Sequence, residues 1–361
     1  MANFERSAAY FRLVRPHWTI ASTLAVMIGI LQAWAEGYSN LLLAALVVGA
    51  AFIQHAVMEV WDELKDYSHY RQDVYADAAQ PPTLFSGGSG VLTGRLLTVP
   101  QVWRFFYTLL GIYVVVLGGI IAFSGWRFLL CVAAGMFFMF GYNSLLKLSY
   151  VGLGEFSNFA GFGPILVCSA YLAMRMDATS GDPGAGSWNL LAYVSATVLV
   201  QSLILGTVWF GSLHIQEMLD YDEDKAGDKK TLVVRFGKTY ASRVPFVTAL
   251  VILGLAVWLI TVDPAFAFVL PGVLLNVVET AQFMSRWQDE DYFMRKMKSF
   301  FIYRNFVLIS LGLVVSAAFR DLPQAAGTAA LVTLFALTAL TSVPALSFLA
   351  KSRVFTFARA A

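Results

Sequence analysis

Charge is scarce in this sequence. Of its 361 residues only 13% are Asp, Glu, Lys or Arg, whereas 58% are hydrophobic, and the mean hydropathy is +0.67. A soluble domain carries roughly a quarter charged residues. The composition therefore excludes an ordinary soluble globular protein and indicates a polytopic membrane protein. The net charge is only +2, and we expect no nucleic-acid partner.

Cysteine is also scarce, and the N-terminal segment lacks the features of a secretory leader. Cys131 and Cys168 both fall inside apolar runs without metal-ligand spacing, so we expect buried thiols rather than a disulfide or a metal pair. The first 18 residues are polar, basic and amphipathic and contain no short apolar core. We therefore expect no cleavable signal peptide.

Long apolar runs are what the sequence has in abundance. A helix that crosses a bilayer needs about 20 mostly apolar residues. Ten runs meet this requirement, and they predict an all-α membrane bundle. The runs are 18–35, 40–61, 102–123, 127–145, 153–173, 189–212, 244–262, 265–283, 300–319 and 325–349.

The basic residues divide the connections between these runs into two sides. If the N-terminus is cytoplasmic, 22 of the 25 Lys and Arg lie in or beside cytoplasmic segments, and three, Arg127, Arg175 and Arg320, lie on the other side. This bias is typical of helical membrane proteins. The sequence therefore predicts that both termini and both acidic segments described below are cytoplasmic.

The first acidic segment spans residues 58–80 and follows the second apolar run. Asp62 and Asp66 are four residues apart and share a helical face, and Asp73 follows in the predicted loop. Magnesium prefers oxygen ligands and usually takes one or two carboxylates together with substrate phosphates. One such cluster is equally compatible with a solvated helix end.

The second acidic segment, residues 216–237, follows the sixth apolar run and favours the metal interpretation. Gln216, Asp220 and Asp224 are again four residues apart. Carboxylates at the end of a membrane helix are costly unless something binds them. Because two matching clusters lie on the same side of the membrane, we interpret Asp220 and Asp224 as part of a magnesium site for a diphosphate.

A third polar stretch connects the fourth and fifth runs on the same side. Tyr142 and Asn143 end one predicted helix, and Lys147 is the basic residue of this connection. Lys147 is suited to contact phosphate oxygens, but a lysine that extends along the membrane interface has the same sequence signature.

These motifs resemble those of the UbiA superfamily of intramembrane prenyltransferases over about residues 10–320. Residues 220–237 look like the second aspartate-rich motif of the family with its trailing basic segment, and Arg15-Pro16 looks like the start of its first helix. Within the superfamily, residues 87–93 and 150–155 look most like the menaquinone branch, which prenylates 1,4-dihydroxy-2-naphthoate.

The sequence departs from the family pattern at three acidic or amide positions. Asp62 stands where the first motif usually has Asn, and the third acid of that motif, Asp73, comes later than usual. Gln216 stands where the second motif usually has Asn. The family typically has nine helices, so we interpret the chain as one domain, 1–361, with a core at about 10–320 and an extra helix at about 325–349.

The resemblance implies a helical bundle of nine to ten spans around a central tunnel, and a role for each polar motif. Asp66, Asp220 and Asp224 are the expected catalytic residues. The expected Mg²⁺ ligands are Asp62, Asp66, Asp73, Asp220 and Asp224. The residues expected to bind the diphosphate are Arg15, Arg71, Lys147 and Lys225. Tyr142, Asn143 and Gln216 form a weaker candidate pocket for the acceptor.

The expected function is Mg²⁺-dependent transfer of an isoprenyl group from its diphosphate to an aromatic acceptor, in contact with lipid in a bacterial plasma membrane. A membrane terpene cyclase of the same superfamily is the alternative, because the first motif is altered. A CDP-alcohol phosphotransferase is disfavoured by the absence of its D-G-x-x-A-R motif. A cation transporter is disfavoured because transporters place ionisable residues near the membrane midplane.

Overall fold

A computed structural model describes residues 2–67, 89–143, 145–176, 190–298 and 301–320. Eight helices in this part are long and apolar enough to cross a membrane, and a shorter apolar helix spans Trp126–Tyr142. The described residues contain helices and no strands. The prediction of an all-α bundle is confirmed, and the chain is an integral membrane protein. The tenth predicted run, 325–349, lies outside the described residues.

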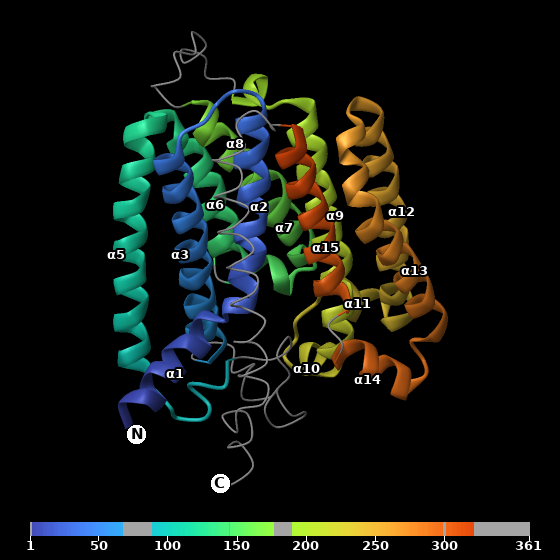
Figure 1. Cartoon of the computed structure of the whole chain (residues 1–361). Helices are drawn as coiled ribbons and strands as arrows, with labels where there is room; N and C mark the ends of the chain where they lie inside the picture. Colours follow the sequence, from blue (N-terminus) through green and yellow to red (C-terminus); the bar gives the residue numbers. More distant parts are fainter. Residues whose placement is uncertain (1, 68–88, 144, 177–189, 299–300, 321–361) are drawn as a thin grey trace.

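In the part of the chain that the structure describes, ten helices build the membrane bundle, and Figure 1 shows their arrangement. They are α2 (Pro16–Ala35), α3 (Leu41–Lys65), α5 (Val99–Ser124), α6 (Leu129–Asn143), α7 (Gly154–Ala160), α8 (Leu166–Arg175), α9 (Ala196–Leu219), α12 (Lys238–Val262), α13 (Leu270–Arg286) and α15 (Phe301–Arg320). A π-helical segment, Gly161–Ile165, joins α7 to α8 within the fifth span and contains Pro164. Proline removes a backbone donor, which accounts for the irregular segment at this point.

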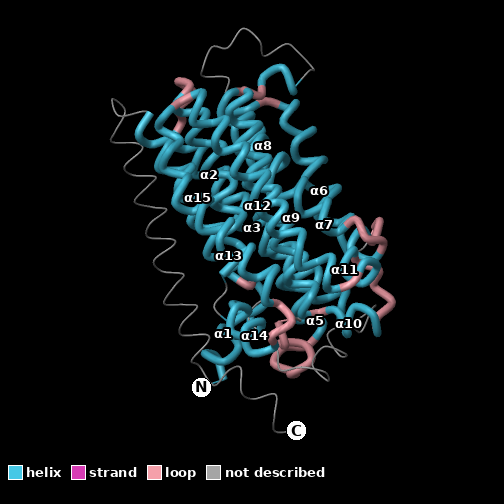
Figure 2. The backbone as a smooth tube through the Cα atoms, turned by 90° about the vertical axis from the view of Figure 1, so that its right-hand side faces the viewer, coloured by secondary structure: helices cyan, strands magenta, loops and turns pink. Residues whose placement is uncertain are grey.

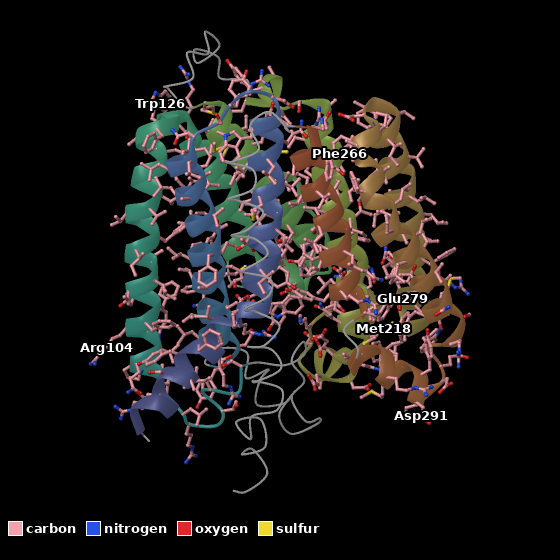
Figure 3. The ribbon with its side chains drawn as sticks, viewed as in Figure 1. Arg104, Trp126, Met218, Phe266, Glu279 and Asp291 are labelled. Carbon is pink, nitrogen blue, oxygen red and sulfur yellow. The ribbon has the colours of Figure 1, made fainter. Side chains whose placement is uncertain are left out.

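Short helices gather at one end of the bundle. These are α1 (Ala2–Val14), α10 (Tyr221–Ala226), α11 (Leu232–Phe236) and α14 (Glu290–Lys298). Figure 2 shows the same grouping from the side. Figure 3 places Arg104 and Asp291 at this end and Trp126 and Phe266 at the opposite end. The segments predicted to lie on one side of the membrane are therefore together in space.

The sixth predicted run differs from the structure. We expected residues 189–212, but α9 begins at Ala196 and ends at Leu219. Leu190–Tyr193 form a separate 3₁₀ turn, and the Ser195 side chain caps α9 by accepting from Val198 N at 3.4 Å. Hydropathy does not separate the apolar turn from the helix. The later end of α9 places Asp220 directly at its C-terminus.

Helix α2 lies at the centre of the bundle. It packs against α3, α8, α9 and α15, and its Ala21, Leu24 and Ile28 side chains are fully buried. A helix that is apolar on every side requires such enclosure. The outer helices α5 and α12 instead expose large apolar side chains, such as Val115 and Val251, as lipid contact demands.

The end of the bundle opposite α1 is closed by polar contacts. Glu36 accepts from Ser195 Oγ at 2.8 Å and from the Tyr171 hydroxyl. Arg175 donates to Tyr193 O at 2.7 Å, and Arg320 pairs with Asp263 at 2.6 Å. Arg175 and Arg320, two of the three arginines predicted to lie on the side with few basic residues, are therefore held by polar partners.

Close helix crossings depend on glycine. A Cβ atom at Gly29 on α2 would lie 2.2 Å from the Val167 carbonyl oxygen on α8. Small residues at such crossings let backbones approach within membranes. Gly49 on α3 is a matched control, because a Cβ there meets nothing within 4 Å.

We predict that Gly29→Ala lowers stability by about 1–3 kcal/mol because α2 and α8 must separate. Gly49→Ala is expected to be neutral or to stabilise α3 by up to about 1 kcal/mol. Thermal unfolding of the two variants in the same detergent measures the difference. Equal melting temperatures for both variants would contradict the close α2–α8 packing.

Candidate active site

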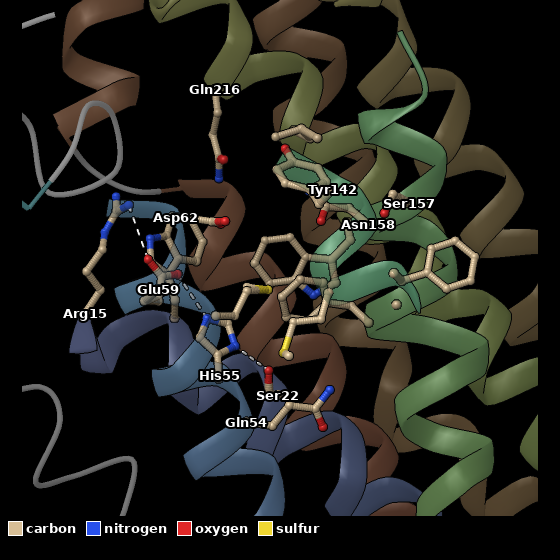
Figure 4. Close-up of a pocket in the computed structure, with 18 of the residues that line it drawn as sticks. Arg15, Ser22, Gln54, His55, Glu59, Asp62, Tyr142, Ser157, Asn158 and Gln216 are labelled. Carbon is tan, nitrogen blue, oxygen red and sulfur yellow. Dashed lines mark hydrogen bonds and ion pairs between the residues drawn. The ribbon is translucent and has the colours of Figure 1, made fainter. Parts of the chain in front are cut away.

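A cavity of about 260 Å³ opens between the ends of α3 and α9 that face the short helices. Figure 4 shows Asp62 and Glu59 on one wall and Tyr142, Asn158 and Gln216 around the same space. Further polar and charged residues line the mouth, and the rest of the lining is apolar or aromatic. The apolar and aromatic residues include Trp18, Met58, Phe138, Met139, Phe162, Ile165, Leu166, Trp209 and Leu213. The cavity therefore joins an acidic mouth to an apolar interior.

The first acidic motif reaches the cavity from the end of α3. Asp62 lies in the last helical turn and Asp66 caps the helix, so one turn separates the two carboxylates. Both residues line the cavity. The run of apolar residues before them is long enough to span the membrane, so both acids lie at the end of α3.

Glu63, between these acids, holds a loop. Its carboxylate accepts from Ser89 N at 2.8 Å and from Leu92 N at 3.4 Å. Arg12 on α1 donates to the Ser89 carbonyl oxygen at 2.7 Å. These contacts tie the segment after the first motif to α1 and α3, so Glu63 has a structural role beside the acidic mouth.

The second acidic motif reaches the cavity from the end of α9. Asp220 follows the last residue of α9, and Asp224 N donates to Asp220 O at 2.7 Å. The Asp224 side chain is buried, and Lys229 Nζ lies 3.1 Å from its Oδ1. Asp222 points elsewhere, because its side chain is 76% exposed and pairs with Lys238 at 3.8 Å.

Negative charge is in excess at this mouth. Among the described lining residues, eight are carboxylates and the cationic side chains are Arg15 and Lys229. The eight are Glu59, Asp62, Glu63, Asp66, Glu217, Asp220, Glu223 and Asp224. Buried charges are expensive without partners, so this arrangement calls for added positive charge.

Burial and the neighbouring charges shift the pKa values of the mouth residues. Burial, followed by neighbouring carboxylates such as Glu63, raises the pKa of Asp66 to about 7. Burial, followed by Asp224, raises the pKa of Asp220 to about 8. Burial opposes the charge of Lys229, but Asp224 and other acids raise its pKa well above the usual value. A bound cation reverses such shifts for carboxyl groups.

The described acids do not form a closed cage. Within the part of the chain that the structure describes, no three His, Cys, Asp or Glu side chains converge closely enough to hold a metal alone. Asp66 Oδ1 is buried and has no hydrogen-bond partner among the described residues. This donor set fits an ion that completes its shell with water and phosphate oxygens, as magnesium does.

Most of the predicted site residues meet at this cavity. Those that line it are Arg15, Asp62, Asp66, Tyr142, Gln216, Asp220 and Asp224. Lys147 and Lys225 do not line it, and both are exposed. Arg71, Asp73 and the side chain of Asn143 lie outside the described residues, although Asn143 ends α6.

Sequence reasoning overlooked Lys229, although it belongs to the basic segment that trails the second motif. Lys225 is closer in sequence to the aspartates, but its Nζ lies over the Tyr221 ring, 5.9 Å from the centroid. The chain turns back after α10, and the amide of Lys229 donates to Asp224 O at 2.8 Å. This turn, which residue spacing does not reveal, brings Lys229 to the carboxylates.

The segment at residues 150–155 supports the loop after the second motif. Glu155 is fully buried and accepts from Leu232 N at 2.8 Å. Lys230 N donates to Tyr150 O at 3.0 Å, and Arg235 donates to Val151 O at 2.8 Å. Glu63 in the first motif bonds to the segment at Ser89, and the loop after the second motif bonds to residues 150–155. Each acidic motif is therefore fixed by contacts with a neighbouring segment.

A sequence profile described as the UbiA prenyltransferase family matches residues 22–305. No curated protein is similar enough in sequence to count as a match.

Three solved structures share the fold. One comes from work on digeranylgeranylglyceryl phosphate synthase in membranes; it has 16% identity and a TM-score of 0.56, covering 87% of this chain and 99% of that chain. A UbiA homologue from Archaeoglobus fulgidus bound to DMAPP and Mg²⁺ has 16% identity and a TM-score of 0.51, with coverage of 83% and 99%. The complex of the same homologue with GPP and Mg²⁺ has 16% identity and a TM-score of 0.51, covering 84% of this chain and 99% of that chain.

We predict that Glu63→Ala frees the segment that contains Ser89 and Leu92. Loss of the two amide contacts is expected to speed hydrogen exchange at Ser89 and Leu92 about tenfold or more, since hydrogen bonds to charged groups are worth about 1.5–3 kcal/mol. Asp222→Ala, which removes an exposed acid, serves as the control. Unchanged exchange at both amides in Glu63→Ala would contradict the anchoring role.

Proposed function

The chain belongs to the UbiA prenyltransferase family, and we propose that it is a Mg²⁺-dependent intramembrane enzyme that transfers an isoprenyl group from its diphosphate to an aromatic acceptor. The observation that carries this proposal is the charge imbalance at the cavity mouth. Eight carboxylates and two cationic side chains among the described lining residues suit a site that takes up divalent cations.

The acidic residues are the proposed metal ligands. Asp62 and Asp66 hold Mg²⁺ from the α3 side, and Asp220 and Asp224 hold it from the α9 side. When bound, Mg²⁺ supplies positive charge that offsets the charge gained by the departing diphosphate. The complexes of the archaeal homologue with DMAPP or GPP and Mg²⁺ support this assignment.

Arg15 and Lys229 are the proposed phosphate contacts within the described cavity. Both are already near carboxylates, at 3.4 Å from Glu59 and 3.1 Å from Asp224. Such pairs position the cations and leave further donors for phosphate oxygens. Asp73 and Arg71, outside the described residues, remain proposed contributors from the first motif.

The apolar interior is the proposed binding site for the isoprenyl chain. Trp209 and Phe162 stack there with ring centroids 4.3 Å apart. Aromatic faces stabilise a nearby cation, which suits the allylic cation left when the C–O bond breaks. An electron-rich acceptor that extends from Tyr142 and Gln216 at the mouth to the reacting carbon then attacks this cation.

We propose a dihydroxynaphthoate-like acceptor and a role in quinone biosynthesis. The resemblance of residues 87–93 and 150–155 to the menaquinone branch supports this choice. We also place the acidic end on the cytoplasmic side of a bacterial plasma membrane. The bias of 22 among 25 basic residues supports that orientation.

A product assay tests the proposal. Purified protein with Mg²⁺ receives geranyl, farnesyl or geranylgeranyl diphosphate, with and without 1,4-dihydroxy-2-naphthoate. We expect a prenylated aromatic product only when the acceptor is present. Cyclic hydrocarbons or alcohols formed equally well without acceptor would instead identify a terpene cyclase.

We predict that Asp66→Ala and Asp220→Ala each abolish turnover, because each removes a proposed metal ligand at the mouth. Asp222→Ala is the matched control, since this acid lies in the same motif but its side chain is 76% exposed. Membrane insertion and monodispersity in detergent show that the variants fold. Near-normal activity in both ligand variants would contradict the metal site.

We further predict that Mg²⁺ binding releases protons and tightens as pH rises. Asp66 and Asp220 have pKa values raised to about 7 and about 8, so both are largely protonated near pH 6.5 and ionised near pH 9. Only the ionised form binds a cation. Calorimetry in buffers of different ionisation enthalpy measures the proton release. Affinity that is independent of pH would contradict the assignment of these ligands.

A further inference from the structure

A chain of four hydrogen-bonded side chains runs along one wall of the cavity (Figure 4). Ser22 Oγ on α2 lies 2.6 Å from His55 Nδ1 on α3. His55 Nε2 lies 3.1 Å from Glu59 Oε1, and Glu59 Oε2 lies 3.4 Å from Arg15 Nη1. Ser22, His55 and Glu59 are 3%, 4% and 8% exposed, and all four side chains line the cavity.

When His55 is neutral, the contacts allow one direction for each hydrogen bond. Glu59 pairs with Arg15, so its carboxylate accepts the Nε2–H of His55. His55 Nδ1 then carries the lone pair and accepts the hydroxyl proton of Ser22. Hydroxyl, imidazole and carboxylate therefore follow the order of a Ser–His–acid triad, with the two ring nitrogens exchanged.

The position of this chain matches a need of the proposed reaction. His55 and Glu59 precede Asp62 by seven and three residues, so they lie about 10 Å and about 4.5 Å farther along α3 from the acidic mouth. This is the region just beyond a diphosphate bound at the mouth, where the reacting carbon would lie. Phe162 packs against the His55 ring with centroids 5.8 Å apart.

Transfer of an isoprenyl group to an acceptor atom that carries hydrogen leaves one proton to remove. The acceptor forms a bond to the allylic carbon, the C–O bond of the diphosphate breaks, and the acceptor loses the hydrogen it carried at the bonding atom. Asp62, Asp66, Asp220 and Asp224 are assigned to the metal, and Arg15 and Lys229 are cations. None of these groups is suited to take that proton.

We propose that Ser22, His55 and Glu59 form a proton relay for this step, an inference that rests on the proposed function. The Ser22 oxygen takes the proton from the acceptor as its own hydroxyl proton passes to His55 Nδ1. The resulting imidazolium is stabilised by Glu59, which Arg15 holds in place. His55 returns the proton to water after the product leaves, so pyrophosphate, coupled product and one proton are the products.

Other ionisable groups share the cavity with His55 and bear on the design of a test. From the helices that line it they are Arg15, Glu59, Asp62, Glu63, Asp66, Tyr142, Glu217, Asp220, Glu223, Asp224 and Lys229. Because the pKa values of Asp66 and Asp220 are raised to about 7 and about 8, a pH profile alone does not isolate His55. A test therefore compares two chemical events, ionisation and coupling, at one pH and at saturating Mg²⁺.

The test measures pyrophosphate release and coupled product in the same reaction. Purified full-length protein receives Mg²⁺, geranyl diphosphate and 1,4-dihydroxy-2-naphthoate. In His55→Gln and Ser22→Ala we expect coupled product to fall about 100-fold or more, the contribution typical of a general base. Pyrophosphate release continues in both variants, and the prenyl group is recovered as the alcohol formed with water.

Matched variants separate a relay from a structural link between α2 and α3. Ser22→Thr keeps the hydroxyl and is expected to retain coupling. Thr23→Ala removes a neighbouring buried hydroxyl that donates to Thr19 O at 3.0 Å within α2, and it is expected to behave like the wild type. We expect a solvent deuterium isotope effect on the rate of coupling in the wild type and in Ser22→Thr, because both carry the hydroxyl that transfers the proton.

Three outcomes would overturn the relay. Coupling at the wild-type rate in folded His55→Gln or Ser22→Ala is the first. A parallel fall of pyrophosphate release and coupling in both variants is the second, because it indicates a structural role. The third is a wild-type protein that releases no pyrophosphate from any allylic diphosphate, a result that removes the proposed function and the relay with it. If His55→Gln does not fold, Ser22→Ala decides between these outcomes.

Discussion

Uncompensated negative charge at the mouth of one cavity is the constraint on which this structure depends. Carboxylates from the ends of α3 and α9 are buried or half-buried beside an apolar interior, where a charge is far more expensive than in water. Lys229 and Arg15 offset part of this charge among the described lining residues. Burial first, and neighbouring carboxylates after it, raise the pKa values of Asp66 and Asp220. A site built in this way is poised for a cation and an anionic ligand together.

The surrounding fold holds the carboxylates of the two acidic motifs close together around the cavity. Glu63 fastens the loop at Ser89 to α3, and Glu155 fastens the start of α11 to α7. Glu36 and its partners lock the far end of α2 against α8 and α9. Because both ends of the bundle are fixed, the acidic ends of α3 and α9 face each other across the cavity and do not face lipid. Acids that look alike in sequence therefore divide into proposed metal ligands and structural anchors.

Hydropathy and residue spacing were sufficient to predict an all-α membrane protein and the meeting of the two acidic motifs on one side of it, and the family resemblance supplied the bundle around a central tunnel. Apolar runs identify membrane helices because the bilayer imposes length and composition on each span. Asp220 and Asp224 could be assigned to one site because a four-residue spacing keeps side chains on one helical face. The start of α9 was misplaced because an apolar 3₁₀ turn has the same hydropathy as a helix.

Contacts between distant segments could not be predicted in this way. Lys229 replaces Lys225 at the cavity because the chain turns after α10, and no periodic pattern encodes that turn. The Ser22–His55 contact joins two helices, and its partners are 33 residues apart in the sequence. His55 and Glu59 have helical spacing, but only packing of α2 against α3 reveals that they continue to Ser22 and Arg15.

The central claim is that both acidic helix ends bind one metal–diphosphate group. It is tested most directly by an experimental structure of the protein with Mn²⁺, in place of Mg²⁺, and a thiolo-diphosphate analogue that does not ionise. We expect metal density between Asp66 and the pair Asp220 and Asp224, with the diphosphate beside Lys229 and the isoprenyl chain in the apolar interior. Metal and diphosphate bound away from either acidic helix end would contradict the account.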